Sequence, residues 1–322
     1  MKKRDFSVDM MKTLAAILIV NSHAAILYPE SIKVLATGGG IGDSLFFYCS
    51  GLLLFGSTTK LSFFNWYKKR VSRIFPVVFC AAIITSVLHQ TYTISVGKIF
   101  FIQGAWFVSC IMIYYAVYYF IDRYFSKYFI HIALIAFALS CIVFFIADTN
   151  NLRFNGEATG KIRWLWFFIA FLAGTYSRKI TNLLQMKLWI SIPVLLVCVA
   201  GYYFFHGAYL TSLHKFQFFL VPFLVGTSII IHIIISGSNK IQTFLEKYPA
   251  PFKVISTLTL NIYLLHNLTF KFCMGIIFPL NLFTMYAATF LLAYLLQIFV
   301  NFFTQTLQKN TIYDWREMIK VW

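Results

Sequence analysis

The segment Val8–His23, VDMMKTLAAILIVNSH, decides the class of fold. It begins with an acidic residue, Asp9, and a basic residue, Lys12, continues as an apolar run and ends in the polar triplet NSH. With its flanking apolar residues, the run is long enough to cross the hydrocarbon core of a bilayer, which takes about 20 residues. We therefore expect a retained first transmembrane helix rather than a cleaved signal peptide.

The composition extends this prediction to the whole chain. Of its 322 residues, 60% are hydrophobic and only 11% are charged, whereas soluble domains have about 25% charged residues. Backbone groups in hydrocarbon must pair internally, which allows helices or closed barrels, and these runs are too long and too apolar for barrel strands. The predicted fold class is all-α: a polytopic membrane protein with about ten transmembrane helices in a single domain, residues 1–322. The expected spans are 8–29, 40–57, 74–91, 105–121, 129–147, 162–178, 188–206, 216–236, 254–275 and 283–305.

The charged residues indicate how these spans are oriented. Most of the 27 Lys and Arg residues fall on one side, including the N-terminus, the 60–73 segment and the C-terminal tail. The positive-inside rule then predicts that both termini are cytoplasmic. The net charge of +17 reflects this asymmetry and attraction to anionic lipid rather than nucleic acid, for which we find no binding module. The six cysteines lie in apolar runs without a CxxC pair, so we expect neither disulfides nor a metal site.

The first predicted helix aligns two polar residues. From Lys12 to His23 a helix makes about three turns and rises about 16 Å, so both side chains lie on one face. A histidine deep in the membrane suits proton transfer because its ordinary pKa is about 6.5. The alternative is that His23 only hydrogen-bonds a neighbouring helix.

A basic segment follows the second span. In FFNWYKKRVSRIFP, Phe63–Pro76, the spacing of Arg70 and Arg73 puts both guanidinium groups on one helix face. Such a pair can bind a phosphate or pyrophosphate bidentately, and Lys69 adds charge nearby. The alternative is an anchor that only sets topology.

A glycine-rich segment, GGGIGDSLFFYCSG, covers Gly38–Gly51. Its acidic residue, Asp43, either caps the start of the second span together with Ser44 or orients His23 or a substrate hydroxyl.

Together these segments resemble the integral-membrane acyltransferase-3 family, whose members O-acetylate sugars of bacterial surface polysaccharides. Asp9, Lys12 and His23 match the family's opening pattern, with lysine where arginine is more common. GIGDSLFFYCSG and RVSRIFP match its next two segments. The later segments AWFV and LNIYLLH, which ends at His266, resemble it more weakly. Asp43 stands where the family more often has an apolar residue.

The resemblance implies an acyl-CoA donor, most often acetyl-CoA. We expect no metal, because the sequence shows no metal-binding cluster. It implies a sugar acceptor on a lipid carrier or nascent polysaccharide, and residence in the bacterial cytoplasmic (inner) membrane. The CoA phosphates would then lie near Lys12, Lys69, Arg70 and Arg73, with the pantetheine arm along the first helix.

Within this scheme His23 is the general base or a transient acyl carrier, and Asp43 assists it. The candidate donors to the oxyanion are Asn21, Ser22 and Ser50. Trp106 and His266 are candidate contacts of the acceptor. Their alternatives are an interfacial anchor for Trp106 and a structural role for His266.

A transporter or exporter of a glycan or glycolipid is the competing class of protein. Many spans, glycine-interrupted helices and intramembrane polar groups occur there too. The arginine pair and the alignment of Lys12 with His23 favour the enzyme.

Overall fold

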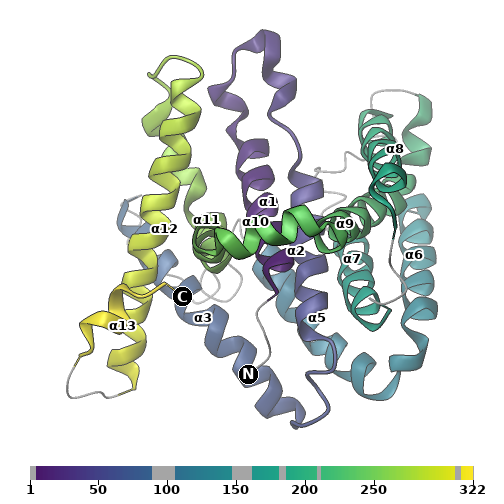
Figure 1. Cartoon of the computed structure of the whole chain (residues 1–322), viewed down its shortest axis with the longest axis horizontal. Coiled ribbons are helices and arrows are strands. Elements are labelled where there is room, and N and C mark those ends of the chain that lie inside the picture. The colour runs from purple at the N-terminus through teal and green to yellow at the C-terminus, as the bar shows by residue number, and fades with distance from the viewer. Residues whose placement is uncertain are drawn as a thin grey trace. The chain divides into compact units, whose positions relative to one another are not determined.

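The computed structural model describes residues 5–88, 106–146, 162–180, 186–208, 212–308 and 313–321. Within these residues there are twelve α-helices and no strand, which confirms the all-α prediction (Figure 1). The helices are α1 Phe6–His23, α2 Gly39–Leu54, α3 Phe63–Leu88, α5 Trp106–Tyr124, α6 Phe129–Ile146, α7 Ile162–Lys179, α8 Leu188–Gly207, α9 Leu220–Gly237, α10 Asn239–Lys247, α11 Pro249–Cys273, α12 Leu280–Leu307 and α13 Trp315–Ile319. The 3₁₀ segments are η1 Ala24–Leu27, η2 Glu30–Leu35, η3 Ser126–Tyr128 and η7 Ser212–Phe219.

Every predicted span overlaps an α-helix, and the chain is polytopic. In the described part of the chain, six segments are long and apolar enough to cross a membrane: Phe6–Leu27, Phe63–Val87, Ser126–Ile146, Leu188–Gly207, Ser212–Gly237 and Leu280–Leu307. The total of ten transmembrane spans stays a prediction. The sequence did not predict the short helices α10 and α13, because neither is long enough to span a bilayer.

The third span begins earlier than predicted. We expected it to start at residue 74, but α3 begins at Phe63 and continues through Pro76. The basic segment is therefore the first part of a long helix. This arrangement keeps Arg70 and Arg73 on one helix face, as their spacing predicts.

The chain divides into two compact units, which we describe separately. The first comprises Met1–Ala15, Gly40–Lys60 and Val117–Tyr248, and the second comprises Ala16–Gly39, Leu61–Ala116 and Pro249–Trp322. Helices α1 and α5 each contribute residues to both units.

In the first unit, α2 and α7 cross at two glycines. A Cβ atom at Gly51 would lie 2.0 Å from the carbonyl oxygen of Phe171, and one at Gly174 would lie 2.0 Å from that of Tyr48. Membrane helices approach this closely where small residues face each other, because lipid provides no hydrophobic drive for association. The crossing therefore depends on the absence of a side chain at both positions.

We expect Gly51→Ala and Gly174→Ala to destabilise the protein by about 2 kcal/mol or more, because each methyl group would overlap backbone that cannot rotate away. The matched control is Gly207→Ala at the end of α8, where a Cβ atom meets nothing within 4 Å. Thermal unfolding midpoints in detergent measure the effect. Midpoints for the two crossing variants that equal the control's would show that the crossing tolerates a side chain.

The second unit contains a contiguous apolar core. Helices α11 and α12 pack side by side, and α3 packs against both (Figure 1). Ala16 and Val20 of α1 belong to the same buried cluster as Leu258 and Ile262 of α11. This cluster holds the end of α1 against α11.

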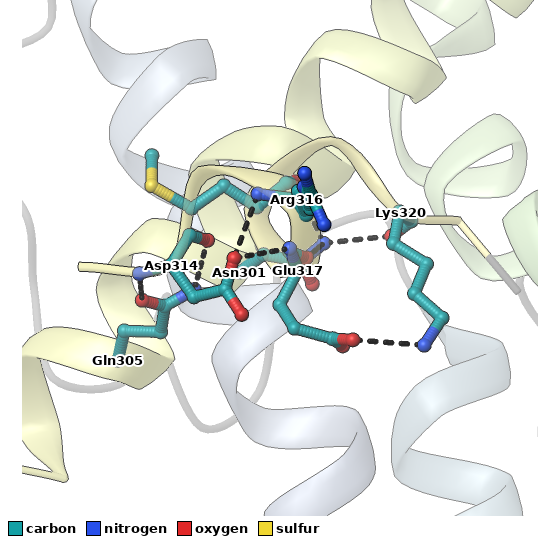
Figure 2. A network of polar contacts seen from close by, with 7 residues as sticks. Asn301, Gln305, Asp314, Arg316, Glu317 and Lys320 are labelled. Atoms are coloured by element: carbon teal, nitrogen blue, oxygen red, sulfur yellow. Dashed lines mark hydrogen bonds and ion pairs between the residues drawn. The ribbon is translucent and has the colours of Figure 1, made fainter.

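The C-terminal segment is attached to α12 by amide side chains (Figure 2). Gln305 exchanges two hydrogen bonds with the backbone of Asp314: its Nε2 donates over 3.1 Å, and its Oε1 accepts over 3.0 Å. The Asp314 carboxylate in turn accepts from backbone N–H groups in the first turn of α13. Nδ2 of Asn301 lies within hydrogen-bonding distance of three carbonyl oxygens, those of Glu317, Met318 and Lys320. These contacts fix α13 without requiring a long apolar face on that short helix.

Candidate active site

Two histidines from distant parts of the sequence meet in the second unit. His23 is the last residue of α1 and is exposed, whereas His266 lies in α11 and is 1% exposed. Nδ1 of His23 lies 2.8 Å from Nε2 of His266, and the ring centroids are 4.8 Å apart. The other nitrogen of His266, Nδ1, lies 2.7 Å from the carbonyl oxygen of Tyr263 and 3.3 Å from that of Ile262. The result is a continuous chain from a helix carbonyl through His266 to His23.

The polar residues next to His23 bond to backbone. Nδ2 of Asn21 donates to the carbonyl oxygens of Leu35 at 2.8 Å and Thr37 at 3.0 Å. Its Oδ1 accepts from the hydroxyl of Tyr28 at 2.6 Å. Asn21 thus uses both amide hydrogens to hold the segment that links η2 to α2.

Ser22 lies in the same turn of α1, and its position explains a glycine in the glycine-rich segment. Its hydroxyl donates to the carbonyl of Ile19 at 2.8 Å. A Cβ atom at Gly39 would lie 2.4 Å from the Oγ of Ser22, and the adjacent Gly38 has a φ of +100°, which favours glycine. These glycines let the start of α2 pass directly beside the end of α1.

The basic segment forms one face at the start of α3. By helical geometry Lys69, Arg70 and Arg73 lie within an arc of about 100°. The guanidinium carbon of Arg70 lies 4.9 Å from the ring centroid of the fully buried Trp66, in cation–π geometry. Arg73 and Lys69 are exposed. One cation of this face is therefore held by packing while the other two extend into the surroundings.

The first unit holds Lys12, Asp43 and Ser50. Lys12 is half-buried in α1 and interacts electrostatically with Cys49. Ser50 is buried and donates to the carbonyl of Phe46 at 2.9 Å. The structure brings His23 and His266 together in the second unit, which also contains Asn21, Ser22 and the α3 basic face.

The capping role considered for Asp43 is wrong. Helix α2 begins at Gly39, so Asp43 lies inside the helix, where its carboxylate interacts electrostatically with Arg163. Ser44 does not cap either, because its Oγ lies 2.8 Å from that of Ser228 in α9. The glycines before Asp43 start the helix earlier than a capping pattern predicts.

Trp106 is the first residue of α5 and is half-buried. Its ring packs edge-on against Phe107 with a centroid distance of 6.2 Å, and Phe107 in turn contacts Tyr263 at 5.3 Å. The ring of Phe107 therefore connects Trp106 to the turn of α11 that carries His266.

The sequence-based predictions missed two groups that bind candidate site residues. The carbonyl of Tyr263 binds His266, and the hydroxyl of Tyr28 holds Asn21. The first has a sequence signal, because side chains on a helix tilt toward the preceding turn, whose carbonyls belong to residues three and four positions earlier. The second has none, since it depends on the turn after α1.

Comparisons with known proteins identify the family of the chain. A family model described as an acyltransferase domain, of the acyltransferase-3 type, matches residues 5–304. Comparisons with curated proteins and with solved structures found no match. Because the family match covers nearly the whole chain, the protein belongs to the acyltransferase-3 family and is a multi-pass membrane acyltransferase.

Proposed function

We propose that the protein transfers an acyl group, most often acetyl, from cytoplasmic acyl-CoA to a hydroxyl of a surface-glycan sugar. The observation that carries this proposal is the His23 imidazole at the end of α1, bonded to His266 over 2.8 Å in a chain of the acyltransferase-3 family. An imidazole can take a proton near neutral pH, which hydroxyl acylation requires.

The α3 basic face, Lys69, Arg70 and Arg73, is the proposed site for the phosphates of the donor. CoA carries several negative charges, and guanidinium groups bind phosphate oxygens bidentately. The stacking of Arg70 on Trp66 supports this role, because a guanidinium held in place loses less freedom on binding. We include Lys12 in the proposed donor site because it matches the family's opening pattern.

In the proposed reaction, Nε2 of His23 removes the proton from the acceptor hydroxyl as its oxygen attacks the thioester carbonyl. The carbon–sulfur bond then breaks, the acyl group stays on the sugar oxygen, and the imidazolium returns its proton to the leaving thiolate to form free CoA. A transient acyl group on His23 is the variant of this scheme in which the imidazole itself attacks the thioester.

The attack creates an oxyanion that needs hydrogen-bond donors. Ser22 is the preferred candidate, because a hydroxyl can turn away from its helix carbonyl by rotating one bond. Ser50 has the same freedom on α2. Asn21 would first have to release the segment that links η2 to α2. Asp43 and Trp106 remain candidates for holding the acceptor sugar.

We further propose that the acceptor is carried by a lipid or by a nascent polysaccharide at the outer side of the bacterial cytoplasmic membrane. Both termini would then be cytoplasmic, together with the α3 basic face and most of the 27 Lys and Arg residues. The charge distribution supports this orientation, and so does a donor that is made inside the cell.

Release of CoA thiol by the purified protein in liposomes tests the proposed function. With acetyl-CoA outside the vesicles and a soluble sugar acceptor, we expect thiol release that rises with acceptor concentration and matches the acetylated product. A glycan exporter would instead move labelled glycan across the vesicle membrane without releasing thiol. That second result would replace the enzyme by the transporter.

A further inference from the structure

We propose that His266 is a positioning residue that keeps the proton of His23 on Nδ1 and leaves Nε2 of His23 as the unprotonated nitrogen. This inference rests on the proposed function, in which Nε2 of His23 accepts the proton of the acceptor hydroxyl. It gives His266 a role through His23 rather than a contact with the sugar.

The contact with the Tyr263 carbonyl fixes the protonation of His266. A carbonyl oxygen only accepts hydrogen bonds, and Nδ1 of His266 lies 2.7 Å from the carbonyl oxygen of Tyr263. Nδ1 of His266 must therefore carry a hydrogen. In a neutral imidazole the remaining nitrogen, Nε2, then has only a lone pair and can only accept.

The protonation of His266 in turn fixes which nitrogen of His23 carries the hydrogen. Nε2 of His266 faces Nδ1 of His23 over 2.8 Å, so the hydrogen between them belongs to Nδ1 of His23. The lone pair of His23 is then on Nε2. The opposite arrangement would need a second proton on His266, and a cationic ring that is 1% exposed, with Phe270 5.7 Å away, would be costly.

The hydrogen bond between His23 and His266 also affects the proposed reaction. When Nε2 of His23 takes a proton, its Nδ1–H becomes a stronger donor, and Nε2 of His266 is already in place to accept from it. His266 thus stabilises the imidazolium without changing its own protonation. The carboxylate of a serine protease performs the same task for its histidine, and imposing the wrong tautomer there costs about 10⁴-fold in rate.

Two amide variants separate positioning from packing. In His266→Gln the side-chain oxygen lies as many bonds from Cα as Nε2 does, so it can still accept from His23. In His266→Asn the amide can bond the Tyr263 carbonyl but is one bond too short to reach His23. We expect transfer to fall about tenfold or more in His266→Asn and to recover largely in His266→Gln. Donor Kd should stay unchanged in both.

The deciding measurement is ¹⁵N NMR of histidine-labelled protein in lipid nanodiscs, with the signals of His23 assigned by comparison with His23→Asn. We expect His23 to be protonated on Nδ1 in the unmodified protein and in His266→Gln, and to become a mixture of tautomers in His266→Asn. Protonation of His23 on Nε2 in the unmodified protein would overturn the inference without any variant. An unchanged tautomer in folded His266→Asn would do the same. Thiol release tests the proposed function separately, so the failure of one is distinguishable from the failure of the other.

Discussion

Replacing His23 by alanine, asparagine or glutamine is expected to lower acyl transfer by about 10² or more, the usual loss when a positioned general base is removed. Donor binding should persist, because the proposed phosphate contacts are on α3 rather than on the end of α1. The asparagine variant is the most informative of the three. Its amide nitrogen occupies the position of Nδ1 and can still donate to His266, but no basic nitrogen replaces Nε2.

Comparing these variants distinguishes a role of His23 in proton transfer from a role in helix packing. If His23 only joined α1 to α11, His23→Asn would keep that hydrogen bond and much of the activity. Acetyl transfer and acetyl-CoA binding should therefore be measured separately on purified variants in lipid. Thermal unfolding midpoints are the control for folding. Near-normal transfer by both amide variants would exclude His23 as the base and return it to a structural role.

Removal of both guanidinium groups from α3 should weaken acetyl-CoA binding more than any other change in the donor site. Hydrogen bonds to charged groups contribute about 1.5–3 kcal/mol each. Arg73→Ala should thus raise Kd about tenfold to a hundredfold, and Arg70→Ala with Arg73→Ala together should raise it further. Arg73→Lys should recover only part of the affinity, because an ammonium group lacks the planar fork. Isothermal titration or a fluorescent CoA analogue measures the effect.

Two controls show whether the effect reflects phosphate recognition. Lys68 is exposed next to Lys69 but points about 140° away from Arg73, so Lys68→Ala removes an equal charge from a different face of α3. S-acetylpantetheine carries the thioester but no phosphate, so the arginine variants should use it as well as the unmodified protein does. Equal losses in Lys68→Ala and Arg73→Ala would indicate general electrostatic attraction, and full binding by the folded double variant would remove α3 from the donor site.

The sequence alone determined the features that depend on local order. Apolar runs of membrane length require helices, because backbone groups cannot stay unpaired in hydrocarbon. The spacing of Arg70 and Arg73 set them on one helix face, since the helical period applies wherever a helix forms. The first-helix pattern, the glycine-rich segment and the basic segment together were enough to identify the acyltransferase-3 family, which the match over residues 5–304 then confirmed.

Only the tertiary structure decided which helices meet and in what rotation. His23 and His266 are distant in the chain, and their contact follows from the packing of α1 against α11 rather than from any spacing. The crossing of α2 and α7 at Gly51 is of the same kind. The stacking of Arg70 on Trp66 is instead a local contact, because the two residues are four apart in α3. Local periodicity fixes which residues share a face. The close packing of whole helices selects the face that each of them meets, and that selection depends on the shape of every side chain between them.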